Sequence, residues 1–288
     1  MRRFEYHEPR TLDEAVVLLS EFGGGASVLA GGTDLLVEIK EHLRRPDHLV
    51  NIKKIAGMDQ LSFDSSSGLQ FGSLVTAREI EVCPAVHRHY RGLVQATNEL
   101  GSIQVRNRAT IAGNICRASP SADTLPPLIA DGARLTVYGP DGRRCIALED
   151  FFVGPGKTVL RADEIVTAIE VLAPLPRSAS IYIKHGRRKA MELATVGVAV
   201  SLSVGDGDVC DRIRIVLGAV APRPIRAKRA EEILQGQVLE RRLIEAAAQA
   251  AMDETRPISN IRGSAAYRRD MTRVLTERAI VQARETIQ

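Results

Sequence analysis

The sequence predicts an α+β fold in which helices and short strands alternate first and antiparallel strands follow. Three features indicate this: a helix signal at Thr11 that leads into alternating strand-like and helical runs, a proline-rich segment at residues 173–178, and alternating apolar residues beyond it. A chain of 288 residues is long enough for two domains. We therefore expect two subdomains at residues 1–56 and 57–175, and a C-terminal domain at residues 176–288.

The first subdomain is predicted to open with helix and strand units. Thr11 and Glu14 have the spacing of a capping box, and apolar residues at helical spacing follow until the glycines at 23–25. A short strand is expected at 27–30, and Leu35, Leu36, Ile39 and Leu43 then predict a second helix. A further strand is expected at 48–52.

The second subdomain and the C-terminal domain carry similar signals. A capping box at 76–79, a helix near 93–100, and a helix begun by Asp123, Thr124 and the prolines after Leu125 are predicted. Strands are expected at 69–74, 134–138, 144–147, 165–171, 180–184, 195–204 and 212–219, and C-terminal helices at 239–252 and 265–283.

Composition excludes several classes of partner. The 39 basic and 35 acidic residues are interspersed and give a net charge of +4, which is too small to indicate nucleic acid. Aromatic residues make up 4%, so base-stacking platforms are not expected. No apolar run has the length of a membrane span, and no apolar run follows the charged N-terminus as in a signal peptide. A cytoplasmic protein with reduced thiols is expected.

Common catalytic and metal motifs do not fit. Gly156, Lys157 and Thr158 resemble part of a phosphate-binding loop, but Phe151 stands where that motif needs its first glycine. The dinucleotide, zinc-protease and serine-hydrolase motifs are absent, and no cysteine pair has metal-ligand spacing. We therefore assign no catalytic residue and no metal ligand. Cys116 is interpreted as a packing residue rather than a redox centre.

Two glycine-containing segments carry the functional signal. The first is Ala30, Gly31, Gly32, Thr33, Asp34 and Leu35, and the second is residues 110–114, Thr-Ile-Ala-Gly-Asn. Glycine lets the backbone turn sharply and approach a ligand closely, and the amides of such turns converge on anions. Each segment alone is typical of any tight turn. Together they could hold the two phosphates of a dinucleotide.

The combination of motifs resembles a known family. The two glycine segments, Ala-Ser-Pro-Ser-Ala-Asp at 118–123, and Lys-His-Gly-Arg-Arg-Lys-Ala-Met-Glu-Leu-Ala at 184–194 occur in that order. The chain thereby resembles, over its whole length, the FAD-binding medium subunit of molybdenum hydroxylases, of the carbon monoxide dehydrogenase and xanthine dehydrogenase type. Ala112 replaces a glycine of many relatives, and Thr33-Asp34 follows the xanthine dehydrogenase pattern rather than the His-Ser of carbon monoxide dehydrogenases.

The resemblance implies where FAD binds. Residues 30–35 wrap the pyrophosphate, the second segment completes the cradle, Asp123 holds ribityl or ribose hydroxyls, and Lys184 lies near the polar edge of the flavin ring. Arg187, Arg188 and Lys189 belong to a loop near the ring. The cofactor-binding residues expected are Ala30, Gly31, Gly32, Thr33, Asp34, Leu35, Leu100, Thr110, Ala112, Gly113, Asn114, Asp123, Val166 and Lys184. Core packing explains Leu100 and Val166 nearly as well, and Asp123 could instead cap a helix.

The resemblance also implies the reaction. Such a subunit accepts electrons from two [2Fe-2S] clusters on a small subunit, while a large subunit carries the molybdenum cofactor, and FAD passes the electrons to an external acceptor. Two alternatives remain open from the sequence: a stand-alone flavin oxidoreductase of the same fold, and a flavin-free scaffold. No acid/base pair that could face a flavin substrate is evident, and intact glycines at 31, 32 and 113 disfavour a scaffold.

Overall fold

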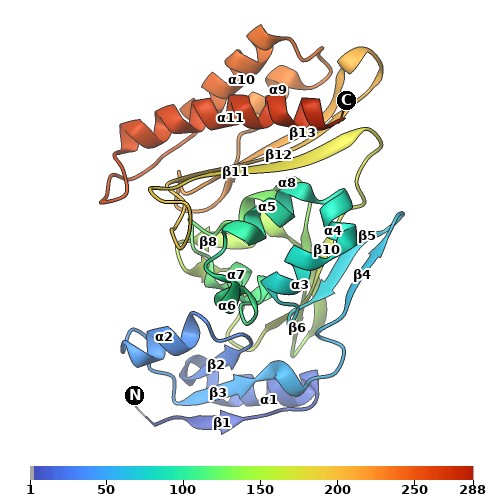
Figure 1. Ribbon diagram of the computed structural model, residues 1–288. Helices are drawn as coiled ribbons and strands as arrows, with labels where there is room; N and C mark the ends of the chain where they lie inside the picture. Colours follow the sequence, from blue (N-terminus) through green and yellow to red (C-terminus); the bar gives the residue numbers. More distant parts are fainter. Residues whose placement is uncertain (1–2, 288) are drawn as a thin grey trace.

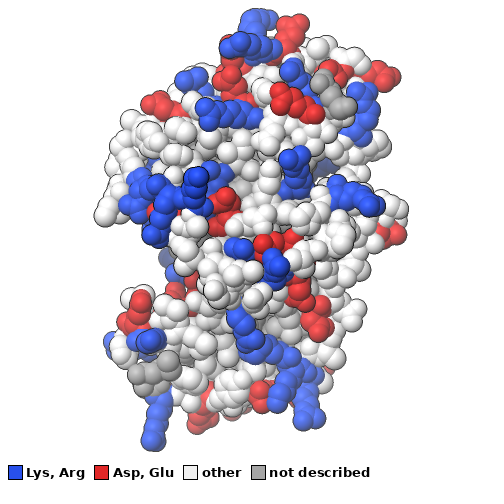
Figure 2. Space-filling model, viewed as in Figure 1, with Lys and Arg blue, Asp and Glu red and all other residues white. Residues whose placement is uncertain are grey.

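The computed structural model describes residues 3–287 and stacks three sheet-containing parts end to end (Figure 1). The N-terminal part lies at one end, the middle part in the centre, and the C-terminal part at the other end. Lysine, arginine, aspartate and glutamate side chains are interspersed over the face in Figure 2, in keeping with the small net charge. Within the described range, no helix is long and apolar enough to cross a membrane.

The N-terminal part contains a parallel sheet in the order β1-β3-β2. Thr11 Oγ1 accepts a hydrogen bond from the amide of Glu14 at 3.1 Å and begins α1, as predicted, and Gly23 ends it with a φ of 48°. The short strand β1 was not expected, because its three residues gain their regular geometry only by pairing with β3. The elements are β1 (Glu5–His7), α1 (Leu12–Phe22), a 3-10 turn (Gly23–Gly25), β2 (Ala26–Leu29), α2 (Leu35–Lys40), β3 (His48–Asn51) and a 3-10 turn (Ile52–Lys54).

The middle part is an antiparallel sheet in the order β4-β5-β10-β6-β7, with helices packed against it (Figure 1). The capping box of Thr76 and Glu79 is confirmed at the start of α3. The strands are β4 (Leu61–Asp64), β5 (Gly68–Gly72), β6 (Arg134–Gly139), β7 (Gly142–Ala147), β8 (Phe152–Gly154), β9 (Lys157–Thr158) and β10 (Ile165–Val171). The helices are α3 (Ala77–Val82), α4 (Pro84–His89), α5 (Arg91–Glu99), α6 (Ile103–Arg106), α7 (Ile111–Arg117), α8 (Leu125–Ala130) and a 3-10 turn (Leu148–Asp150).

The second glycine segment is not a loop. Residues 111–117 form α7, and Gly113 lies in its first turn, where Thr110 Oγ1 accepts a hydrogen bond from the Gly113 amide at 3.0 Å. A threonine hydroxyl that accepts a hydrogen bond from the amide three residues later is the usual N-cap arrangement. The prediction of a tight turn at this segment was therefore wrong, because these residues form the N-cap and the first turn of a helix.

The C-terminal part is an antiparallel sheet in the order β11-β12-β13-β14 that carries α9, α10 and α11 on one face (Figure 1). Its other face packs on the middle part, because Tyr182, Ala199 and Val216 belong to the core of that part. The short helix α9 was not predicted. The elements are β11 (Ser178–His185), β12 (Val196–Val204), a 3-10 turn (Asp206–Asp208), β13 (Cys210–Gly218), β14 (Ile225–Arg226), α9 (Lys228–Leu234), α10 (Arg241–Asp253) and α11 (Ala265–Ile287).

The two junctions between the parts differ. The smaller N-terminal core includes Ala15, Val16 and Leu19 and takes one fully buried residue, Ile165, from the middle sheet. The C-terminal sheet instead contributes an unbroken apolar row to the middle core. The predicted division into two subdomains at residues 1–56 and 57–175 and a C-terminal domain at residues 176–288 stays a prediction.

We expect Ile215→Ala to destabilise the chain strongly. Ile215 is fully buried between the C-terminal sheet and its helices, and truncating such a side chain costs about 2–5 kcal/mol. The free energy of unfolding in urea measures the effect. Val17→Ala on the 62% exposed position of α1 is the control and is expected to change stability by less than about 0.5 kcal/mol. Equal effects of the two substitutions would contradict the assigned core.

Candidate functional site

A cavity of about 420 Å³ lies where the N-terminal part meets the middle part. The connection from β2 to α2 forms one wall, the start of α7 forms another, and β10 forms a third. The predicted residues that line it are Ala30, Gly31, Gly32, Thr33, Asp34, Leu35, Leu100, Thr110, Ala112, Gly113, Asn114 and Val166. Asp123 and Lys184 are not among the lining residues.

The two predicted segments meet at Gly31. A Cβ atom on Gly31 would lie 1.9 Å from the carbonyl oxygen of Arg108, two residues before Thr110. No side chain fits at such a distance, so glycine is required for the backbones to touch. Gly32 has a φ of 77°, and a Cβ there would lie 3.0 Å from the side chains of Leu29 and Leu36. Both glycines are thus needed for the wall itself, before any ligand is considered.

The first segment presents backbone donors to the cavity. Within the described part of the chain, the amides of residues 31–35 donate no hydrogen bond to a protein group, whereas the Leu36 amide bonds to the carbonyl of Gly32. A backbone amide away from water needs an acceptor. Consecutive free amides around a turn are a typical anion-binding arrangement. The wall formed by residues 31–35 is therefore suited to phosphate groups.

The second segment adds one polar side chain that faces the same space. Asn114 Oδ1 accepts a hydrogen bond from Thr124 Oγ1 at 2.6 Å, which fixes the amide group of Asn114 at the cavity wall. The hydroxyl of Thr110 is already used to cap α7. The structure thus gives Thr110 a structural task, while Asn114 keeps its Nδ2 group as a donor for a ligand.

Charged residues that the sequence did not single out lie at the rim. Glu38 pairs with Arg44 at 3.3 Å and with Arg117 at 2.8 Å, and all three line the cavity. Arg117 belongs to the middle part, so this cluster joins the two parts across the opening. Asp34 and Glu164 also line the cavity, so its charged lining as a whole carries no surplus of positive charge. The spacing of Glu38, Arg44 and Arg117 in the sequence does not predict that they meet.

Asp123 and Lys184 form a buried ion pair behind the cavity wall. Lys184 Nζ lies 2.9 Å from Asp123 Oδ2, and Tyr182 Oη donates to Asp123 Oδ1 at 2.7 Å. Burial raises the pKa of Asp123 to about 6, although Lys184 opposes that rise. The sequence grouped these residues through resemblance alone, and the structure brings them into direct contact.

Lys184 also holds two segments that do reach the cavity. Its ammonium group donates to the carbonyl of Glu99 at 3.1 Å and to that of Glu192 at 2.7 Å. The residues that follow these carbonyls, Leu100 and Leu193, line the cavity. Lys184 therefore fixes the wall from behind. Leu193 was missed by the sequence analysis, although it lies within the segment that carries the resemblance.

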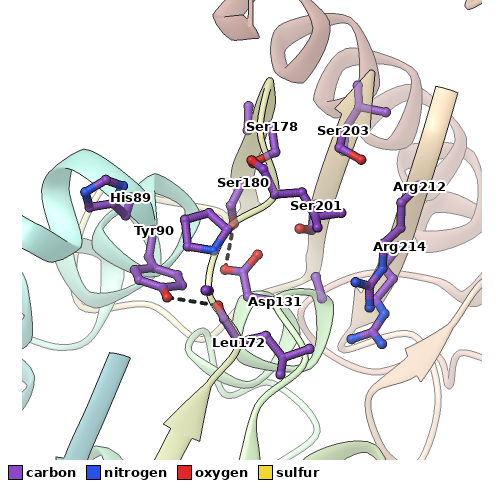
Figure 3. Close-up of a pocket in the computed structure, with 16 residues that line it drawn as sticks. His89, Tyr90, Asp131, Leu172, Ser178, Ser180, Ser201, Ser203, Arg212 and Arg214 are labelled. Carbon is purple, nitrogen blue, oxygen red and sulfur yellow. Dashed lines mark hydrogen bonds between the residues drawn. The ribbon is translucent and has the colours of Figure 1, made fainter. Parts of the chain in front are cut away.

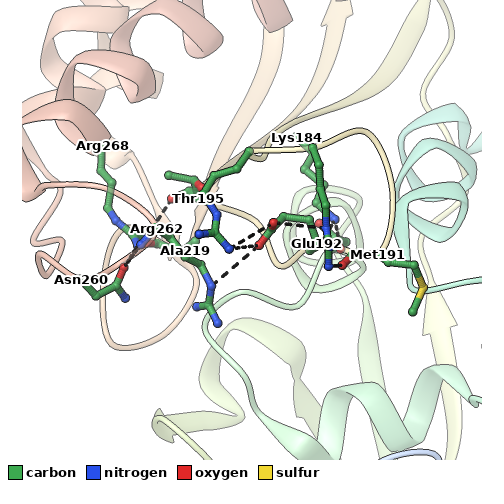
Figure 4. A network of polar contacts seen from close by, with 11 residues as sticks. Lys184, Met191, Glu192, Thr195, Ala219, Asn260, Arg262 and Arg268 are labelled. Carbon is green, nitrogen blue, oxygen red and sulfur yellow. Dashed lines mark hydrogen bonds and ion pairs between the residues drawn. The ribbon is translucent and has the colours of Figure 1, made fainter.

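The turn between β11 and β12 is held by a carboxylate surrounded by arginines (Figure 4). Glu192 is paired with Arg187 at 3.1 Å, with Arg188 at 3.5 Å and with Arg262 at 4.0 Å. The hydrogen bond from Arg187 lowers the pKa of Glu192, so the carboxylate stays charged. The basic segment that the sequence placed near the flavin is thus tied back to its own turn.

Two family models match the chain. Residues 2–174 match the FAD binding domain in molybdopterin dehydrogenase, and residues 181–283 match the CO dehydrogenase flavoprotein C-terminal domain. The chain therefore belongs to the flavoprotein family of the molybdenum hydroxylases, and it is an FAD-binding oxidoreductase subunit of that family.

Particular relatives cover nearly the whole chain. The xanthine dehydrogenase FAD-binding subunit of Escherichia coli is 32% identical, over 96% of this chain and 95% of the relative. The carbon monoxide dehydrogenase medium chain of Hydrogenophaga pseudoflava is 33% identical, over 96% of each. A solved structure of carbon monoxide dehydrogenase from the same organism matches with a TM-score of 0.94 and 34% identity, over 98% of this chain and 97% of that one. The two types of relative are similar to this chain to the same degree.

We expect Lys184→Met to raise the pKa of Asp123 further, because Lys184 holds that pKa down. A carboxyl whose folded-state pKa lies above the unfolded value stabilises the fold when protonated, and this contribution is lost as pH rises through the folded pKa. In the flavin-free parent the loss therefore runs from about pH 4, the unfolded-state pKa, to about pH 6, the folded-state pKa. In the variant it moves to higher pH.

The free energy of unfolding as a function of pH measures this shift, with NMR titration of the Asp123 carboxyl carbon as the direct readout. Lys189→Met removes an exposed lysine of the same turn and is the matched control. An unchanged profile in Lys184→Met would show that the pair does not form in solution.

Proposed function

We propose that this chain holds FAD in the cavity between its N-terminal and middle parts and serves as the electron-transfer subunit of a molybdenum hydroxylase. It takes electrons from [2Fe-2S] clusters on a small partner subunit and passes them to an external acceptor. A large partner subunit carries the molybdenum cofactor and the substrate. The observation that carries the proposal is the run of free amides at residues 31–35, which line the cavity. At Gly31 this segment packs against the backbone of Arg108, just before the second segment of the cavity wall.

The cavity fits the group. Its volume of about 420 Å³ lies within the range of about 300–1,000 Å³ that is usual for cofactor and ligand sites. The amides of residues 31–35 and Asn114 Nδ2 supply donors for a pyrophosphate. Leu100, Val166 and Leu193 supply an apolar surface that keeps water from a ring system. When bound, FAD supplies a carrier that accepts two electrons and releases them singly or in pairs.

Asp123 and Lys184 are proposed to act at the edge of this site. The Asp123 carboxylate accepts two hydrogen bonds and has capacity for more. Because Asp123 does not line the cavity, its contact with a ribityl or ribose hydroxyl is supported by the family resemblance and not by the cavity geometry. Lys184 is a positive charge with a side chain only 5% exposed. A fixed cation near the ring stabilises the anionic reduced form of a flavin, because charge interactions are strong away from water.

Two observations support partner subunits: the names of the relatives, and the lack of groups for substrate chemistry in the described cavity wall. The relatives named as a medium chain and as an FAD-binding subunit are parts of larger enzymes by their names. Among the described residues of the cavity wall, we find no acid/base pair placed for substrate chemistry. These facts best support electron supply from another subunit.

We expect Gly31→Ala to abolish FAD binding, because the added Cβ would collide with the Arg108 carbonyl and force the two cavity walls apart. Gly24→Ala is the matched control, because nothing lies within 4 Å of its added Cβ. The flavin released by heat from each purified protein is identified by mass and quantified by absorbance. Parent and control should yield FAD, and the variant should yield none. FMN from the parent, or full FAD from Gly31→Ala, would sink the assigned cradle.

A further prediction of the proposed function concerns the complete enzyme. The chain purified in its native complex should be accompanied by one subunit that carries molybdenum and one that carries iron and sulfide, as metal analysis and subunit mass will show. Substrate should bleach the flavin absorbance in the complex and not in the isolated chain. Turnover of an organic substrate by the isolated chain, with no molybdenum or iron present, would replace this proposal with the stand-alone oxidoreductase.

A further inference from the structure

A second, smaller cavity lies on the far side of the middle part, against the C-terminal sheet. It has a volume of about 40 Å³ and is bounded by the end of α8, the segment after β10, and strands β11, β12 and β13 (Figure 3). It shares no lining residue with the proposed FAD cavity. Polar side chains line it: His89, Tyr90, Asp131, Ser178, Ser180, Ser201, Ser203, Arg212 and Arg214.

The sheet supplies these groups in two rows across three strands. Ser178 pairs with Ser203, which pairs with Arg212, and Ser180 pairs with Ser201, which pairs with Arg214. Side chains two residues apart on a strand face the same side, so both rows face the middle part. The next row on this face is the apolar one of Tyr182, Ala199 and Val216. The sheet thus changes from apolar to polar where the middle core ends.

The arginines of these rows have no carboxylate partner. Among the described residues neither Arg212 nor Arg214 makes an ion pair, whereas the neighbouring Arg226 is bound to Glu149 and Glu231. Burial lowers the pKa of Arg214 and the charges of Arg212 and Arg226 lower it further, while the charges of Glu149 and Glu231 oppose this shift. Two adjacent guanidinium groups at a partly buried site repel each other unless an anion lies between them.

The carboxylate in the cavity does not meet this need. Ser180 Oγ donates to Asp131 Oδ2 at 2.8 Å (Figure 3). Ser180 and Ser201 both lower the pKa of this carboxyl. Burial raises the pKa of Asp131 to about 6, and the charge of Arg214 opposes that rise, so the carboxyl is still mostly ionised at neutral pH. Within the described range, however, Asp131 forms no direct ion pair with Arg212 or Arg214. Ser203 in contrast is 3% exposed, and its hydroxyl has no hydrogen-bond partner among the described residues. A buried hydroxyl without a partner indicates a missing acceptor.

We propose that this cavity binds one small tetrahedral oxyanion, inorganic phosphate or sulfate, between Arg212, Arg214 and Ser203. Guanidinium groups match the paired oxygens of such an ion, and the Ser203 hydroxyl donates to a third oxygen. A volume of about 40 Å³ accommodates roughly three water molecules or one such ion, and it excludes a nucleotide.

The test uses the FAD-loaded chain, so that the phosphate-binding segment at residues 31–35 is already occupied. Isothermal titration with sodium phosphate and with sodium sulfate, at an ionic strength held constant with sodium chloride, measures binding. Arg212→Gln is expected to weaken both ions by at least about tenfold, as for the loss of a charged hydrogen bond, and Ser203→Ala is expected to weaken them several-fold. Arg242→Gln, an exposed arginine on α10 with the same charge change, should bind like the parent.

Thermal unfolding gives an independent readout, because an ion that binds only the folded chain raises the melting temperature. The rise should occur with phosphate or sulfate in the parent and in Arg242→Gln, and should be much reduced in Arg212→Gln and Ser203→Ala. If the parent shows no saturable binding of either ion up to about 10 mM, or if both cavity variants bind as the parent does, the site does not exist. Should Arg212→Gln fail to fold, the Ser203→Ala comparison decides alone.

Discussion

The contact between Gly31 and the Arg108 carbonyl is the constraint on which the candidate site depends. It brings the end of β2 within van der Waals contact of the residues that precede α7, although the two lie far apart in the sequence. The same turn leaves the amides of residues 31–35 without internal acceptors, and it places them across the cavity from Asn114. The close contact at Gly31 and the free amides thus occur in the same short segment.

The buried pair of Asp123 and Lys184 stabilises a different side of the cavity. Removing two charges from water is costly, and the geometry offsets that cost by giving Lys184 three oxygen acceptors and Asp123 two donors. Because two of those acceptors are carbonyls next to Leu100 and Leu193, the position of the apolar wall is set by polar contacts behind it. A residue outside the lining can thus govern the shape of the site.

Much of the fold was accessible from the sequence, for physical reasons that individual elements show. The helix at Thr11 and the capping box at Thr76 depend on local hydrogen bonds that a few residues encode, and both were found. Strand β1 and helix α9 depend on distant partners, so local pattern gave no signal for them. The second glycine segment was predicted as a tight turn because glycine is uncommon inside helices. In the structure Thr110 caps α7, and Gly113 is tolerated in its first turn.

The two junctions of the molecule have unequal strength, and this bears on how a large cofactor enters. The row of Tyr182, Ala199 and Val216 makes the C-terminal sheet part of the middle core, so separating them would expose the interior of the protein. The N-terminal core draws only Ile165 from the middle sheet into full burial, and charged contacts such as that of Arg117 with Glu38 complete the seam. Fewer buried side chains therefore hold the N-terminal part to the middle part than hold the C-terminal sheet to it, and the weaker of the two junctions is the one that encloses the cavity.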